Sequence, residues 1–267
     1  MKKKSRARRR FVSDLSEEEI SVLWEIFDFT YDDVDEMKFR QDLLQKERVI
    51  TLHDSKDQRI LGFSTVVLSP EKRREKKVWV LFSGDTALRE EAWGDRSLVT
   101  GFFLELIRFQ LLHPFTPIYW LLISKGYKTY LLLTRNFPVH WPRHDAKTPK
   151  EMEDMMRSLV RSRFDSVEDK GNSIFILPPG NGKVKRGIAP LTEDLLKISD
   201  IRFFNDANPD HASGYELCCL GLVNLRLFLK MTMKILKGPA RSRKRSAQNF
   251  SSKNRFRFTI DDEAKHA

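Results

Sequence analysis

Asp85 follows a predicted central strand at 77–84 and precedes a predicted helix at 97–112. A carboxylate at the end of a strand can act as a general base or orient a water molecule. Acids in such places also serve as ordinary loop or capping residues. Asp85 is therefore a candidate catalytic residue, with a capping role as the alternative.

The loop between this strand and this helix has the position of a phosphate-binding loop. A strand that runs into a helix N-terminus presents free backbone N–H groups and the positive end of the helix dipole. The loop sequence, DTALREEAWGDR at 85–96, nevertheless contains one glycine, Gly94, and two adjacent acids, Glu90 and Glu91. Its position predicts an anion site, whereas its composition indicates that the site is altered.

The predicted elements run helix, helix, three strands, helix, strand, helix, and then two further strands separated by a helical insertion. The polar turn between the first two strands predicts an antiparallel hairpin. The strand–helix–strand order over 77–124 predicts that strands 77–84 and 117–124 are adjacent, parallel and divergent at their C-terminal ends. The expected helices are 17–28, 33–46, 97–112, 127–137, 149–163, 191–205 and 223–237, and the expected strands are 48–53, 60–69, 77–84, 117–124, 172–179 and 215–222.

This element order resembles the GNAT acyltransferase superfamily, over residues 11–135 and more loosely over 172–222. The pantetheine-pyrophosphate loop of that family is written Q/R-x-x-G-x-G/A, and Arg89-Glu-Glu-Ala-Trp-Gly-Asp-Arg-Ser stands in its place. The resemblance implies an α/β (α+β) fold with a mixed central sheet flanked by helices. It also implies a divergent donor site with a degenerate loop, formed by Arg89, Trp93, Gly94, Asp95, Arg96 and Ser124.

The same resemblance implies a general acid on the helix after strand 117–124. Tyr127 and Tyr130 lie there, about one turn apart, and Tyr130 is the preferred candidate, with simple packing as the alternative. Phe137, His140 and Trp141 lie in the following Pro-rich link and are assigned to a lid or substrate pocket. His140 and His144 are not expected to bind a metal, because the intervening Pro142 argues against a helix.

The net charge of +11 comes from the two ends of the chain. Residues 1–10 contain seven Lys/Arg and residues 237–260 contain eight, without an acid in either segment. The remaining body, 11–236, has 32 basic and 34 acidic residues and is nearly neutral. We therefore expect basic flexible tails at 1–10 and 237–267, around one domain at 11–236 with a core at 11–135 and a C-terminal half at 149–236.

The expected function is acyl transfer from acyl-CoA or an acyl carrier protein to an amine or hydroxyl. The predicted helix 223–237 has a basic stripe on an apolar body and leads into the basic tail, which is typical of an interfacial anchor or docking helix. A cytoplasmic protein at the inner membrane surface, acting on an amphiphile, fits this pattern. The alternatives are a non-catalytic binding protein on the same fold and a nucleic-acid binder that uses its tails.

Overall fold

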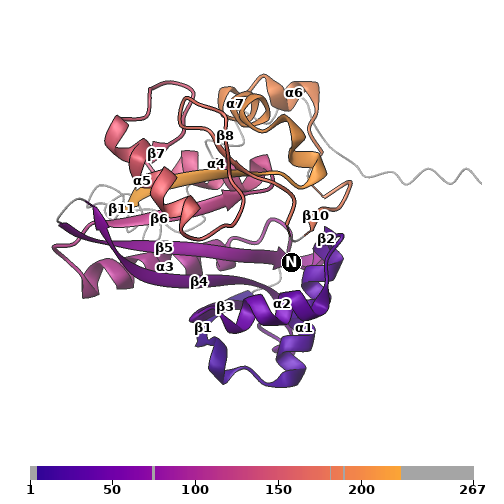
Figure 1. The fold of residues 1–267 in the computed structure, drawn as a ribbon. Helices are drawn as coiled ribbons and strands as arrows, with labels where there is room; N and C mark the ends of the chain where they lie inside the picture. Colours follow the sequence, from indigo (N-terminus) through magenta and orange to yellow (C-terminus); the bar gives the residue numbers. More distant parts are fainter. Residues whose placement is uncertain (1–4, 74–75, 181, 189, 224–267) are drawn as a thin grey trace, which may run out of the picture. The chain divides into compact units, whose positions relative to one another are not determined.

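The computed structural model describes residues 5–73, 76–180, 182–188 and 190–223, which belong to one unit, Met1–Phe228 (Figure 1). A mixed sheet runs through this unit. In spatial order its strands are β1 (Ser5–Phe11), β3 (Arg48–Asp54), β4 (Ile60–Arg73), β5 (Lys76–Leu88), β6 (Ile118–Ser124), β11 (Glu216–Val223), β9 (Phe175–Leu177) and β8 (Glu168–Asp169). The short strand β7 (His140–Trp141) pairs with β11. A separate β2–β10 ribbon joins Tyr31–Asp32 to Lys183–Val184.

β5 and β6 form the parallel pair of the described sheet, and the other described pairs are antiparallel. β5 and β6 pair from Trp79–Ile118 at one end to Ser83–Leu122 at the other. The connection between them passes through α3, Ser97–Leu112, because a parallel pair requires a crossover. The predicted parallel arrangement of these strands is confirmed.

Beyond Ser83 and Leu122 the two strands part. β5 continues to Leu88 alongside β4, well past its predicted end, while the last residues of β6 pair with β11. At the point of parting, the single residue Thr65 of β4 lies opposite two residues of β5, Gly84 and Asp85. This two-against-one arrangement is a β-bulge, which bends the strand that carries the extra residue. The predicted divergence is confirmed, and the bulge is its physical cause.

Helices cover both faces of the sheet. The shared register of β4 and β5 places α1, α2 and α5 on one face, and the ring contacts of Trp120 with Phe102 and Phe137 place α3 and α4 on the other. No helix in the described ranges is long and apolar enough to span a bilayer. The remaining bounds are α1 (Glu17–Thr30), α2 (Glu36–Leu44), α4 (Tyr127–Asn136), α5 (Lys150–Arg161), α6 (Glu193–Leu196) and α7 (Ser199–Ala207).

The predicted start of the first helix is confirmed by its cap. Ser16 Oγ accepts a hydrogen bond from the backbone N–H of Glu19 at 3.2 Å, and the Glu19 carboxylate accepts one from the Ser16 N–H at 3.0 Å. This capping box satisfies two backbone donors that the first turn would otherwise leave free.

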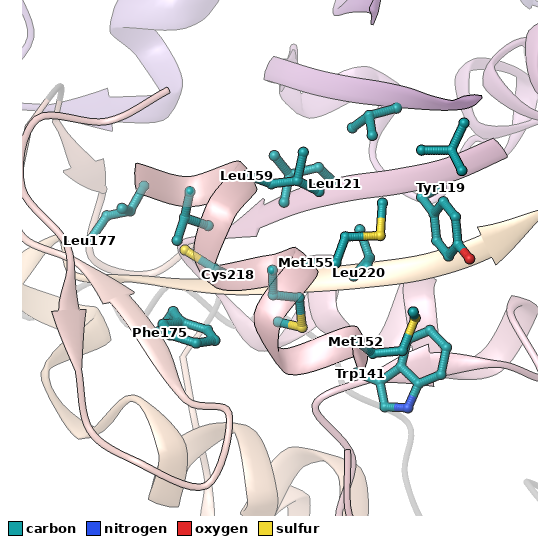
Figure 2. Packing of buried hydrophobic residues seen from close by; sticks show 14 residues of the cluster. Tyr119, Leu121, Trp141, Met152, Met155, Leu159, Phe175, Leu177, Cys218 and Leu220 are labelled. Carbon is teal, nitrogen blue, oxygen red and sulfur yellow. The ribbon is translucent and has the colours of Figure 1, made fainter. Parts of the chain in front are cut away.

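One core cluster lies between α5 and the β5–β6–β11 part of the sheet (Figure 2). Met152, Met155 and Leu159 point from one side of α5 toward the sheet. Their partners on the sheet include Tyr119, Leu121, Cys218 and Leu220. Both cysteines of the chain, Cys218 and Cys219, are buried free thiols.

The expectation of a flexible tail over 1–10 is wrong for residues 5–10. Ser5–Phe11 form edge strand β1, which pairs with β3 from Ser5–Asp54 to Phe11–Arg48. Its arginines are held by acids elsewhere in the fold, since Arg9 pairs with Glu105 and Arg10 with Glu19. Charged side chains are common on edge strands, where they oppose pairing with another chain. The predicted helix 223–237 and basic tail 237–267 lie outside the described residues, apart from Val223.

Gly101 allows α3 to approach the sheet closely. A Cβ at this position would lie 2.7 Å from Ala7 Cβ and 3.1 Å from Ile50 Cγ2. We predict that Gly101→Val lowers the free energy of unfolding by about 1–3 kcal/mol through overpacking, as measured by urea denaturation. Gly180→Val is the control, because a Cβ there would have its nearest neighbour, Pro178 O, at 3.9 Å. Equal stability of the two variants would contradict the close helix–sheet contact.

Candidate active site

Asp85 lies at the bulge where β5 parts from β6. Its carboxylate is only partly exposed, and burial raises its pKa, while the positive charges of Lys46 and Lys125 oppose that shift. No ion pair to another described residue fixes this carboxylate. A carboxyl group with a raised pKa at a break in the sheet is a candidate for proton transfer.

A second carboxylate, Glu216, lies near the end of β6. Glu216 and Lys125 extend the register of β11 and β6 by one step beyond the pair Leu217–Ser124, and their charged atoms are 3.2 Å apart. Their side chains are only 15% and 16% exposed, so the pair is largely shielded from water. Burial raises the pKa of Glu216, with Lys125 acting against that shift.

The β2–β10 ribbon contacts both β5 and the segment after β6, where these two strands separate. Tyr31 of β2 donates a hydrogen bond from its hydroxyl to the carbonyl of Thr86 on β5, at 2.9 Å. Lys125, which follows β6, lies 5.2 Å from the Tyr31 ring centroid and donates to the carbonyl of Gly182 at 3.0 Å. Burial, followed by the charges of Asp85 and Glu216, raises the pKa of Tyr31. The ribbon therefore lies at the place where β5 and β6 separate, and it shields the charged side chains there from water.

The bulge itself requires a glycine and leaves a polar atom available. A Cβ at Gly84 would lie 2.6 Å from Thr65 Oγ1, so a larger residue would not fit without rearrangement. Thr65 Oγ1 is buried and has no hydrogen-bond partner among the described residues. Gly84 and Asp85 also have no Cα partner on β4 or β6 in the described register. The unpartnered hydroxyl of Thr65 thus lies beside the irregular part of β5.

The two candidate tyrosines of α4 are buried, whereas Asp85 is partly exposed. Tyr130 is fully buried, donates a hydrogen bond to the carbonyl of Pro142 at 3.0 Å, and packs against Phe203 and Phe204 of α7. Burial raises the pKa of Tyr130 and of Tyr127, which favours their neutral forms. A general-acid role for either residue stays a prediction. The Tyr130 hydroxyl already has a structural partner in the carbonyl of Pro142.

The three residues predicted to line a substrate pocket are core residues. Phe137 is fully buried against Trp120, and Trp141 packs into the α5 cluster. The His140 ring accepts or donates a hydrogen bond with the carbonyl of Phe137 at 2.7 Å through Nδ1, and burial lowers its pKa. All three side chains are therefore part of the protein interior. Among the described residues no group of three or more His, Cys, Asp or Glu side chains is arranged to hold a metal.

The N-terminus of α3, where a phosphate would bind, is occupied by a carboxylate of the chain itself. Asp95 Oδ1 accepts a hydrogen bond from the backbone N–H of Ser97 at 2.7 Å, and Asp95 Oδ2 accepts one from the hydroxyl of Ser5. Arg96 is the N-cap residue but makes no side-chain capping bond. A carboxylate at a helix N-terminus satisfies the same donors and the same dipole that a phosphate would.

The other donor-site candidates of the loop do not point to a phosphate cradle. Arg89 pairs with Glu25 of α1 at 3.1 Å and lines a surface pocket of about 480 Å³ together with His53. Trp93 is 44% exposed and donates to the carbonyl of Leu88 at 3.3 Å, so its ring does not fill the parting. Gly94 has a left-handed φ of 79° with open space around it. Ser124, the remaining candidate, donates to the carbonyl of Gly126 at 2.9 Å.

Sequence reasoning identified Asp85 but not its surroundings. Lys46, Lys125 and Tyr31 come from three different segments and are brought together by the sheet and the β2–β10 ribbon. Lys125 had a usable signal, since it directly follows strand 117–124. Tyr31 had none, because a two-residue strand leaves no periodic pattern.

No family model matches this chain, and no curated protein matches it in sequence. Similar solved structures include a probable N-acyltransferase from Enterococcus faecalis V583 (11% identity, TM-score 0.37), the GNAT family N-acetyltransferase YhbS of Escherichia coli in complex with CoA (10%, 0.34) and Escherichia coli ElaA (14%, 0.37). The matches cover 50%, 46% and 53% of this chain and 33%, 64% and 95% of those chains. The chain thus spans about one third of the Enterococcus protein.

The fold is GNAT-like. Its defining features are the parallel β5–β6 pair, the α3 crossover between these strands and the mixed sheet around them. The predicted fold class is confirmed.

The occupied helix N-terminus generates a prediction about free CoA. The Asp95 carboxylate already caps α3, and Glu90 and Glu91 add negative charge to the same loop. We predict that acyl-CoA binds only weakly, with a Kd above about 10 μM by calorimetric titration, because its pyrophosphate would meet these acids.

Asp95→Asn is the matched variant, since it removes the charge but keeps an oxygen that can cap the helix. We expect it to tighten acyl-CoA binding. Submicromolar binding by the unmodified protein, lost on changing Trp93 or Arg96, would show that the loop still cradles pyrophosphate.

Proposed function

We propose that this protein is an acyltransferase that binds the carbonyl end of a thioester donor at the Gly84–Asp85 bulge. The observation that carries the proposal is the bulge itself, where two residues of β5 share one opposing residue of β4, Thr65, and have no partner on β6. Backbone N–H groups aimed at a carbonyl oxygen stabilise the negative charge that develops when the thioester is attacked. Thr65 Oγ1, buried and without a partner among the described residues, is a further donor at the same place.

In the proposed reaction Asp85 acts as the general base. An acceptor amine or hydroxyl attacks the thioester carbon while its proton passes to the Asp85 carboxylate. The C–S bond then breaks, a C–N or C–O bond has formed, and the proton ends on the departing thiolate. Burial raises the pKa of Asp85 above its ordinary value, which makes its carboxylate a stronger base for this proton transfer. Lys46 and Lys125 are the nearby cations that favour the charged form of Asp85, and Lys125 is paired with Glu216.

The loop chemistry favours a donor that does not depend on a pyrophosphate cradle. A pantetheine arm carried by an acyl carrier protein meets this condition, because its thioester is the same as that of acyl-CoA while its phosphate is a single diester. Acyl-CoA is the second donor, bound without help from the α3 N-terminus. We further propose an amphiphilic acceptor at the cytoplasmic face of a membrane, in keeping with the basic apolar sequence of 223–237.

A non-catalytic binding protein on the same fold is the second candidate function. The capping of α3 by Asp95 and the closure of the parting by the β2–β10 ribbon favour it. In that case the charges at the parting would stabilise the fold or bind a ligand, and no thioester would be turned over.

Asp85→Asn separates these two functions. We predict that it lowers kcat with an acyl carrier thioester by about 10²-fold or more, because the amide cannot accept the proton. The rate of the unmodified protein should rise with pH through the raised pKa of Asp85, since the base must be ionised, and this limb of the profile should vanish in the variant. Release of free thiol, followed spectrophotometrically, is the measurement. No acyl transfer by the unmodified protein to any amine or hydroxyl tested would favour the binding protein.

Tyr130→Phe is the comparison variant. Its hydroxyl binds the carbonyl of Pro142, so we expect a loss of about 1 kcal/mol in stability, with kcat changed only a few-fold. A loss of turnover as large as that of Asp85→Asn, in a stably folded variant, would restore Tyr130 as the general acid.

A further inference from the structure

The outward side of α3 is apolar although it faces solvent. Leu104, Leu111 and Leu112 are 51%, 65% and 59% exposed. With Arg108 they occupy positions i, i+4, i+7 and i+8, which share one face of a helix. Such a face is normally polar in a helix that covers a sheet, so a contiguous apolar strip of this kind indicates an interaction surface.

The loop after α3 extends this strip. Phe115 is 98% exposed, between Pro114 and Pro117, and packs against almost nothing in the described structure. The His113 ring of the same loop stacks on the Trp79 ring, with the ring centroids 4.5 Å apart. The backbone N–H of Trp79 donates a hydrogen bond to the carbonyl of Pro117 at 2.9 Å. The loop is therefore anchored to β5 and holds Phe115 outward.

Cations flank the strip where the β4–β5 hairpin meets this loop. Lys77 lies 4.7 Å from the Trp79 ring centroid, and Lys72 is its partner across the hairpin. Lys72, Lys76, Lys77 and Arg108 are exposed and form no ion pair with another described residue. The one acid of α3, Glu105, is buried and pairs with Arg48 and Arg9 on the sheet side. The surface thus combines exposed apolar side chains with unneutralised positive charge.

The chain leaves the described structure beside this surface. Val223, the last described residue of β11, pairs with Ile118, which directly follows the 113–117 loop. The sequence from 224 to 237 is apolar and basic, with Arg226, Lys230 and Lys234. The described chain therefore ends beside the loop that carries Phe115, and a stretch of similar chemical character follows in the sequence.

We propose that the surface formed by Leu104, Arg108, Leu111, Leu112, Phe115, Lys72 and Lys77 docks on an anionic lipid bilayer. The apolar side chains enter the interfacial region, and the cations contact lipid phosphates. A second copy of the chain fits this surface less well, because it would bring the same unneutralised cations face to face. The inference does not depend on the proposed acyl transfer.

The test is co-sedimentation of the full-length protein with phosphatidylcholine vesicles, with and without phosphatidylserine. We expect binding to the anionic vesicles. The double variant Leu111→Ser/Phe115→Ser should weaken this binding at least tenfold, while Met37→Ser/Leu44→Ser should leave it unchanged. Met37 and Leu44 are the matched control, since they are 69% and 68% exposed on α2. Thermal melting of each variant checks that the fold is retained.

Charge is tested separately from apolar insertion. The double variant Lys72→Gln/Lys77→Gln should weaken binding by about 25-fold at low salt, from roughly fivefold per cation. Lys56→Gln/Lys147→Gln removes the same charge from exposed positions elsewhere and should have a much smaller effect. Equal binding by each variant and its control would overturn the proposal, as would dimerisation through this surface, or binding to single-stranded nucleic acid instead of vesicles.

Discussion

The candidate site depends on one irregularity in the sheet, the bulge at Gly84 and Asp85. Because a single residue of β4, Thr65, opposes both of them, β5 bends and follows β4 while β6 stays with β11. Without the bulge, β5 would continue to pair with β6 and the two strands would not separate. The same bulge carries Asp85, whose carboxylate is stabilised in its charged form by Lys46 and Lys125. Geometry and electrostatics at this site therefore share one origin.

The charged side chains around the bulge interact with one another and are largely shielded from water. Lys125 contacts Glu216, the Tyr31 ring and the Gly182 carbonyl, so it links β6, β11 and the β2–β10 ribbon. A buried charge is costly unless it is paired, which explains why Glu216 and Lys125 lie directly opposite each other. The α3 N-terminus follows the same rule, since the Asp95 carboxylate satisfies donors that would otherwise bind an external anion. These internal pairings distinguish the chain from a simple phosphate-binding α/β protein.

Strong local patterns predicted most of the fold. Helix 97–112 was predicted with the bounds it has, because its apolar run is long and lies between two clear strands. Strand β1 was missed, because its arginine-rich sequence shows no apolar alternation and its pairing with β3 depends on acids such as Glu105 and Glu19. Asp85 was identified from its place at the end of a strand. Its bulge was not, since the sequence placed the end of β5 at Gly84. The position of Tyr130 against α7 depends on tertiary packing that no local pattern encodes.

The most direct measurement of the central claim follows backbone amides of the ¹⁵N-labelled protein during titration with an acyl-pantetheine. This ligand contains the thioester and its arm without the nucleotide, so it isolates the parting from the α3 N-terminus. If the bulge binds the thioester carbonyl, the Gly84 and Asp85 amide resonances should shift most, followed by those of Lys125 and Tyr31 around the opening. Saturable shifts confined to Asp95–Ser97, or no saturable shift at Gly84 and Asp85, would contradict the account.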